Sequence, residues 1–448
     1  MGNIIAASNF NRFGKRHDDD FTDRLSHQFT CVLLLICTLF VTGRQYSGHP
    51  IDCWVPEQFT YSYRSYTHSL CWTKNTYYIP TYDNIPKSSE KRSDRELVYY
   101  QWVPIILLTQ MGLFFLPSII WRTLQGSCGI DINQIVEEVN HKRNINPKER
   151  EKVMGYLVKS MVNYFSLTRF PTKKYCYTAR SRISRYTFLL CGRQFGNKMI
   201  GSYLFVKVLY ICNAIGQIYL LNAFLGKGTD YTFFGFGVLY DLLQSGDWTT
   251  SQSFPRTTLC DFEIREFAHN IHRYTIQCVL SINLFNEKIY IFLWFWFVIV
   301  ASASTYSLVT WVAFAVFEQH HFRYLKSHLS DMDMYDKCKD RYLLGNFLKG
   351  YIKQDGIFLF KMLSKNTSGI IASEALAGVW QEYKKLNAIK ENDINDLEKD
   401  ELKPLNTEPS APSLDEPDGG ITEICPIDGA ISKDDIPKCN GNANGNIK

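Results

Sequence analysis

The chain has 448 residues, a formal net charge of +5, 46% hydrophobic residues and a mean hydropathy of -0.17. These averages exclude an intrinsically disordered chain, a collagen-like fibre and a small disulfide-rich domain. They do not exclude a membrane protein, because polar loops dilute the apolar spans in a whole-chain average.

Hydrophobic residues gather in four blocks along the chain. A transmembrane helix needs about 20 mostly apolar residues. Four segments meet this requirement: residues 27–46, 101–121, 203–225 and 289–317. The last is a run of 29 residues without a charge, which is very rare in a soluble fold. The sequence therefore predicts an all-α membrane protein with four transmembrane helices.

The first block has an alternative interpretation as a cleaved signal peptide. Residues 9–23, which precede it, are polar and charged, and no small-residue cleavage site follows Val41. We therefore expect the block to be retained as the first span, with residues 1–26 as a cytoplasmic N-terminal segment.

The distribution of basic residues predicts the orientation. Residues 122–202 carry 15 Lys and Arg against five acids, whereas residues 47–100 and 226–288 show no basic excess. The positive-inside rule makes 122–202 a cytoplasmic loop, the other two loops extracellular, and both termini cytoplasmic. Lys207 would then lie near the cytoplasmic end of span three, where we expect its side chain to snorkel to the interface rather than to bind an ion.

Both long cytoplasmic segments show helical periodicity. Apolar residues recur at helical spacing in the 122–202 loop and again in residues 318–390, which predicts a helical cytoplasmic domain. From residue 391 the composition changes: residues 391–448 hold 14 Asp and Glu, five Lys and six Pro, with no aromatic residue. This composition predicts an acidic, disordered tail.

Each predicted extracellular loop holds two cysteines, Cys53 and Cys71 in the first and Cys260 and Cys278 in the second. Thiols in an oxidising compartment form disulfides, and four cysteines allow three connectivities, all of which spacing leaves open. A zinc site is the weaker alternative, because neither pair has the close spacing that zinc sites use.

Motifs for catalysis are missing. The chain has no phosphate-binding glycine-rich loop, no HExxH and no nucleophile elbow, and no predicted span contains the carboxylates of a proton-coupled transporter. We therefore expect no enzyme activity, no catalytic residue, no metal site, no cofactor and no nucleic acid partner; the expected surroundings are membrane lipids.

Polar residues in span one recur every seven positions and so share one side of the helix. This polar stripe is made of Thr30, Cys31, Cys37, Thr38, Arg44 and Gln45. Within a membrane such a stripe faces water or protein, so a pore shared by several subunits and helix–helix packing both remain open.

Several motifs resemble those of one family. Tyr99-Tyr100-Gln101-Trp102-Val103, at the start of span two, resembles the YYQWV signature of the innexins, the invertebrate gap-junction proteins. The similarity covers roughly residues 15–360, and residues 1–12 and those after about 390 depart from it. Further matches are Tyr46 and residues 19–25, 48–56, 71–72, 75–77, 254–256, 259–262, 277–280, 282–283 and 286–288.

This resemblance implies a plasma-membrane channel at gap junctions. Innexin subunits form a ring, here of about eight copies of this chain or of a mixture with related subunits. Two rings dock between adjacent cells through their outside loops and pass ions and small molecules, and an undocked ring acts as a hemichannel.

The resemblance also implies roles for particular residues. The family pattern pairs Cys53 with Cys278 and Cys71 with Cys260, in loops with some short β structure. Tyr99 and Trp102 would anchor at the membrane interface, and the N-terminal segment would fold into the pore vestibule as a funnel. The polar stripe would face the pore, with the lining candidates Thr30, Cys37, Thr38, Arg44 and Gln45. An alternative function is a channel-inactive adhesion or scaffold subunit at cell contacts.

Overall fold

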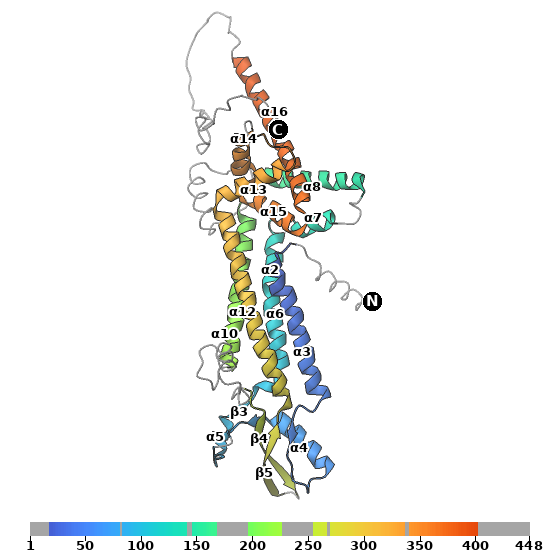
Figure 1. The fold of residues 1–448 in the computed structure, drawn as a ribbon, viewed down its shortest axis with the longest axis vertical. Helices are drawn as coiled ribbons and strands as arrows, with labels where there is room; N and C mark the ends of the chain where they lie inside the picture. The colour runs from blue at the N-terminus through green and yellow to red at the C-terminus, as the bar shows by residue number, and fades with distance from the viewer. Residues whose placement is uncertain are drawn as a thin grey trace, which may run out of the picture. The chain divides into compact units, whose positions relative to one another are not determined.

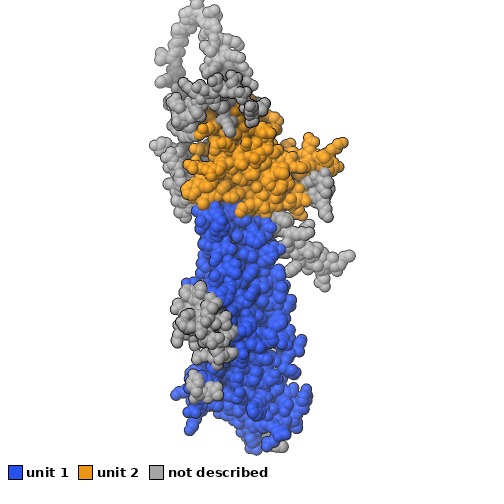
Figure 2. Space-filling view, viewed as in Figure 1, with its two compact units in different colours: residues 1–14, 19–124, 203–312 blue, residues 15–18, 125–202, 313–448 orange. Residues whose placement is uncertain are grey.

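A computed structural model describes residues 18–80, 83–140, 146–167, 196–225, 254–266, 269–336 and 340–401. The chain forms two compact units, coloured separately in Figure 2. Within the described ranges, unit 1 consists of residues 19–124 and 203–312. Unit 2 consists of residue 18, residues 125–202 and the residues after 312.

Unit 1 is built on four long helices that run side by side (Figure 1). The first is nearly continuous and comprises α2 (Phe21–Arg24), a π-helical turn η1 (Leu25–Phe29) and α3 (Thr30–Ser47). The others are α6 (Val103–Gly126), α10 (Lys198–Leu225) and α12 (Ser281–Val316). All four are long and apolar enough to cross a membrane, which confirms the predicted number of spans.

The first and last of these helices begin earlier than hydropathy predicts. The first starts at Phe21 rather than at residue 27, because Asp20 caps it by accepting a hydrogen bond from the Phe21 backbone N–H. α12 starts at Ser281 rather than at residue 289, and its first turns carry polar residues such as Glu287. Hydropathy reports the apolar part of a helix, whereas caps decide where the helix begins.

The bundle has a packed interior and an apolar exterior. Phe114 of α6 and Phe297 of α12 are fully buried, with ring centroids 5.0 Å apart. Large apolar side chains also cover the outer faces, among them Ile36 and Ile299. An outer surface of this kind suits contact with lipid or with another subunit.

One end of the bundle carries a five-stranded antiparallel sheet (Figure 1). The strands β1 (Asp52–Cys53), β2 (Thr76–Tyr77), β3 (Glu96–Leu97), β4 (Thr257–Glu266) and β5 (Asn270–Val279) lie in the order β1-β5-β4-β2-β3. β4 and β5 form a hairpin of two ten-residue strands, which is longer than the short β structure expected. The same loops contain α4 (Tyr61–Lys74), α5 (Ser89–Ser93) and the 3₁₀ turn η2 (Tyr99–Gln101). The sheet thus joins two loops that are far apart in the sequence.

Unit 2 is helical throughout its described residues. It contains α7 (Ile132–Val139), α8 (Pro147–Leu167), α13 (Glu318–Ser330), α14 (Asp340–Asn346), the π-helical η4 (Phe347–Ile352), α15 (Lys353–Asn366) and α16 (Gly369–Glu401). α16 packs against α8, α13 and α15. Its core holds Trp380, whose ring lies 4.9 Å from that of Phe347. The prediction of a helical module is confirmed.

The C-terminal helix extends beyond its predicted end. α16 continues to Glu401, eleven residues past the predicted end at residue 390. Helices propagate cooperatively from a packed first part, and the first helix-breaking proline after that boundary is Pro404. The rest of the predicted acidic tail, residues 402–448, lies outside the described residues, as do residues 1–17 of the N-terminal segment.

Candidate functional site

Two disulfides tie the two loops together at the sheet end. Cys53 of β1 bonds to Cys278 of β5 with a Cα–Cα distance of 3.9 Å, and the two residues are also register partners in the sheet. Cys71 of α4 bonds to Cys260 of β4 with a Cα–Cα distance of 5.8 Å. Both bonds link the first loop to the second, which is the pairing that the family resemblance implies.

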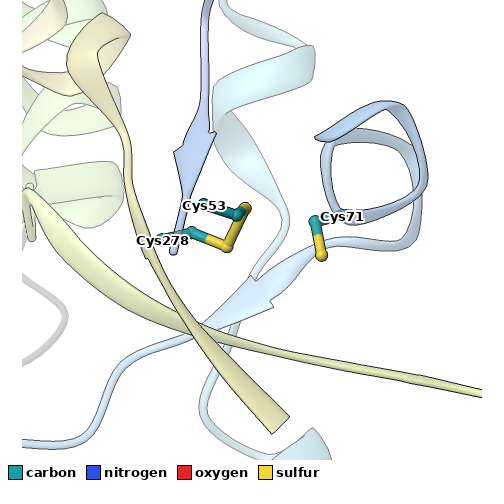
Figure 3. A group of neighbouring side chains, drawn as sticks. All are labelled: Cys53, Cys71 and Cys278. Carbon is teal, nitrogen blue, oxygen red and sulfur yellow. A yellow bond between two sulfur atoms is a disulfide. The ribbon is translucent and has the colours of Figure 1, made fainter. Parts of the chain in front are cut away.

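The two disulfides are neighbours. The sulfur atoms of Cys53, Cys71 and Cys278 lie within 4.8 Å of one another (Figure 3). Three cysteines this close would suit a metal ion if they were free, because zinc is bound by thiolates and not by disulfide sulfurs. All three sulfurs, together with that of Cys260, are already bonded in disulfides, so the arrangement is a covalent clamp on α4, β1, β4 and β5.

The signature residues 99–103 brace this clamp. Tyr100 is fully buried, its ring lies 4.8 Å from that of Trp72, and its hydroxyl donates to the Trp72 carbonyl. Burial raises the pKa of Tyr100 to about 12. Gln101 donates to the same carbonyl and to Asn75 Oδ1 at 3.2 Å. The signature therefore joins the start of α6 to the end of α4.

Tyr99 and Trp102, the two residues expected to anchor at the membrane interface, differ in their exposure. Trp102 is 54% exposed, as an anchor requires, and Val103 is buried. Tyr99 instead packs inside unit 1, with its ring 5.6 Å from that of Phe254, and burial raises its pKa. The expectation for Tyr99 is corrected: its hydroxyl lies in the protein interior, because the sheet brings the second loop over it.

The same end exposes a set of large aromatic side chains. Trp54 is 82% exposed and Tyr61 86%, and Tyr63 and Tyr66 are more than half exposed. Residues 60–66, which include the first six residues of α4, have no buried member, whereas Thr67 and Cys71 near its other end are buried. Exposed tyrosine and tryptophan on a rigid support are typical of protein interfaces.

The polar stripe does not lie on one exposed face. Thr30 is fully buried, where it accepts a hydrogen bond from Trp296 Nε1 at 2.9 Å and donates to the Leu25 carbonyl. Thr38 is 5% exposed and donates to the Leu34 carbonyl within its own helix. The prediction that these two threonines line a pore is corrected, because neither is accessible from outside the chain.

The other three lining candidates are more accessible. Arg44 is exposed, and its guanidinium lies 4.6 Å from the centre of the Phe285 ring. Gln45 donates to the Tyr100 carbonyl at 2.8 Å, and Cys37 is partly buried against the bundle core. Seven residues of an α-helix fall about 20° short of two full turns, so residues spaced by seven drift around its surface.

Sequence reasoning missed a polar cluster at the end of the bundle opposite the sheet. Lys207 of α10 is fully buried rather than snorkelling, and its ammonium group lies 2.8 Å from Asp23 Oδ1. The carboxylates of Asp20 and Asp23 precede the apolar block and lie in the polar stretch that hydropathy assigns to the N-terminal segment. Only the helical continuation from Phe21 brings them beside Lys207.

Unit 2 contains a second buried acid, in a different environment. Asp355 is 2% exposed, and its Oδ1 accepts hydrogen bonds from the backbone N–H groups of Met199 and Ile200 at the start of α10. Its Oδ2 has no hydrogen-bond partner among the described residues. Burial raises the pKa of Asp355 to about 6, and the backbone N–H donors and the charge of Lys353 offset only part of this effect.

Fold and site together define a four-span membrane protein whose two outer loops form one disulfide-clamped structure. A sequence profile of the innexin family matches residues 19–383. Innexin unc-9 of Caenorhabditis elegans is 35% identical over 82% of this chain and 92% of its own length. Innexin-19 of Caenorhabditis briggsae is 34% identical over 86% of this chain and 90% of its own length.

The chain belongs to the innexin family. Innexins are subunits of gap-junction channels in the membrane, and the family is one of channels rather than enzymes. The chain is accordingly a membrane protein of the gap junction, with the four spans that such a subunit needs.

Proposed function

We propose that copies of this chain assemble into a closed ring around a pore, and that two rings in apposed membranes dock through the sheet end. The ring has about eight subunits, by family analogy, and admits related subunits. The docked pair passes ions and small molecules between cells, and the undocked ring acts as a hemichannel; the chain has no catalytic role.

One observation carries the docking proposal. The disulfides Cys53–Cys278 and Cys71–Cys260 fix the sheet and α4 in place, while the first turns of α4 present exposed aromatic side chains. Because the support is already ordered, association costs less conformational entropy. Tyrosine adds contact area with little loss of side-chain freedom.

The proposal also covers orientation and the pore wall. Disulfides form in an oxidising compartment, which favours an extracellular sheet end and a cytoplasmic unit 2. Of the five stripe candidates we place Arg44 at the pore surface, because it is the exposed one. Cys37 and Gln45 flank it as partly buried residues.

Ring formation and conductance are tested on purified protein. In lipid nanodiscs, particle images should show rotational symmetry with about eight subunits, and planar bilayers containing the protein should carry unitary currents. Particles of one or two subunits, or bilayers without current, would contradict the channel proposal.

Docking is tested with a double variant, Tyr61→Ala with Tyr63→Ala. We expect junctional conductance between paired cells to fall at least tenfold, while hemichannel current in single cells stays at the wild-type level. The matched control is Tyr156→Ala, which removes a tyrosine that is 75% exposed on α8 of unit 2. Equal loss in the control, or no loss in the double variant, would remove α4 from the docking surface.

A further inference from the structure

The ammonium group of Lys207 joins three elements of unit 1. It donates to Thr22 Oγ1 of α2 at 3.0 Å and to Ser307 Oγ of α12 at 2.7 Å. It also lies 2.8 Å from Asp23 Oδ1. An ammonium has three donors, and here each has an acceptor on a helix other than α10.

Asp20, which caps α2, and Asp23 within it are held by further donors. Asp23 is 3% exposed, and its Oδ2 accepts from the Tyr203 hydroxyl at 2.7 Å. Asp20 Oδ2 accepts from Trp311 Nε1 at 3.0 Å and from the Ser307 hydroxyl, and it lies 3.8 Å from Lys207. We name this set the N-terminal latch; its members are Asp20, Thr22, Asp23, Tyr203, Lys207, Ser307 and Trp311.

Because Lys207 and Asp23 are both buried, each charge depends on the other for its stability. A buried charge is tolerated only when it is paired and hydrogen-bonded, and removal of one partner leaves the other uncompensated. Lys207 is fully buried, and in the described part of the chain no other Lys or Arg forms an ion pair with Asp23. Lys207 is therefore the cation that compensates the buried Asp23 carboxylate and ties α2 to α10.

The segment that the latch holds meets the rest of its helix at an irregular turn. α2 has four residues and is followed by the π-helical turn Leu25–Phe29, where the α-helical hydrogen-bond pattern changes. Such turns are frequent at functional positions in helices. A short helix beyond an irregular turn can change its position without disturbing α3.

We propose that Lys207 is a positioning residue for gating: its pairing with Asp23 holds α2 in one arrangement against α10 and α12. Release of this pair moves the channel between open and closed states. This inference rests on the proposed channel function and adds to it the residue that sets the equilibrium between the two states.

The test combines hydrogen exchange with hemichannel recording on the full chain. In Lys207→Met we expect amide exchange in peptides covering residues 18–29 to rise at least tenfold, with peptides of β4 and β5 unchanged. The voltage of half-maximal hemichannel current should shift in the same variant. The double variant Lys207→Met with Asp23→Asn should exchange more slowly than Lys207→Met alone, because the buried carboxylate of Asp23 is then no longer left without its cation.

The matched control is Lys198→Met, which removes a lysine of the same helix that bonds to the Ser127 carbonyl and not to α2. It should leave both measurements at the wild-type level. If Lys207→Met does not fold, Asp23→Asn carries the test, because it keeps the shape of the side chain and removes the charge.

Three results would overturn the proposal: unchanged exchange in residues 18–29, an equal rise of exchange in all four spans, or faster local exchange with unaltered voltage dependence. Failure of the channel function is distinguishable, because wild-type protein would then give no current while the exchange measurement still tests the latch.

Discussion

The two ends of the helical bundle are fixed by different chemistry. At the sheet end, two disulfides clamp α4 and the strands covalently. At the opposite end, one buried lysine and two carboxylates hold α2 through hydrogen bonds and ion pairs. A covalent clamp does not open under physiological conditions in an oxidising compartment, whereas a polar latch can be released and re-formed.

This difference suits a subunit that docks at one end and gates at the other. A docking surface gains from rigidity, because order present before binding lowers the cost of association. A gate needs two arrangements separated by a few kcal/mol, which buried charge pairs can supply.

Loss of the Cys71–Cys260 bond should have the largest effect. For Cys71→Ser we expect junctional conductance to be abolished, because removal of a native disulfide typically costs about 2–5 kcal/mol and frees α4 from β4. The measurement is conductance between paired cells at matched surface expression. Cys212→Ser, which removes an exposed free thiol of α10, should couple normally. Normal coupling by Cys71→Ser would contradict the clamp.

Acidification should affect Asp355, a buried acid that has backbone donors in place of a lysine ion pair. Because the folded pKa is raised from 3.8 to about 6, the folded state keeps a proton that the unfolded state releases in this window. Stability from this group therefore falls as pH rises from about 4 to 6, by about 3 kcal/mol in total.

The variant Asp355→Asn isolates this effect. It keeps an oxygen for the Met199 and Ile200 N–H groups but does not titrate. The Tm of wild-type protein in detergent should rise relative to that of Asp355→Asn as pH is lowered from 6 to 4. A difference in Tm that stays constant over this range would show that the carboxyl has an ordinary pKa.

Weakening the latch without removing a charge should have a smaller effect than loss of the Cys71–Cys260 bond or the titration of Asp355. Tyr203→Phe deletes the hydroxyl that donates to Asp23 and should lower the free energy of unfolding by about 1–3 kcal/mol. Tyr306→Phe, at a position that is 72% exposed on α12, is the control and should change stability little. Equal thermal stability of the two variants would argue against a hydrogen-bonded latch.

Thiol modification at Arg44, the exposed residue of the polar stripe, should give the smallest effect. A cysteine at Arg44 should react with a charged thiol reagent in the open hemichannel and change its unitary current, whereas one at Thr38 should not react. Current through the Arg44→Cys and Thr38→Cys variants before and after the reagent provides the measurement. Reaction at position 38 would restore the pore-facing interpretation of the buried threonines.

The sheet end was largely predictable from the sequence. Cys53, Cys71, Cys260 and Cys278 lie in two loops whose charge places them outside, and the number of spans follows from four apolar blocks. The pairing and the long β4–β5 hairpin were not derivable in the same way. Cysteine spacing leaves three connectivities open, and strand register depends on contacts between distant segments.

The opposite end was not predictable. Hydropathy separates Asp20 and Asp23 from the first span and treats Lys207 as an isolated charge, because it averages along the chain and ignores contacts across it. The seven-residue spacing of Thr30, Cys37 and Arg44 likewise identified one side of a helix but not what that side faces. Burial of Thr30 by Trp296 depends on how α12 packs, which periodicity within one helix does not encode.

The central claim, that this innexin forms channels between cells by docking at its clamped end, is tested most directly by dual recording from paired cells that express it as the only gap-junction subunit. We expect a junctional current that appears after contact forms, together with transfer of a small fluorescent dye. Abundant protein at the contacts without current or dye transfer would contradict it and would favour an adhesion role.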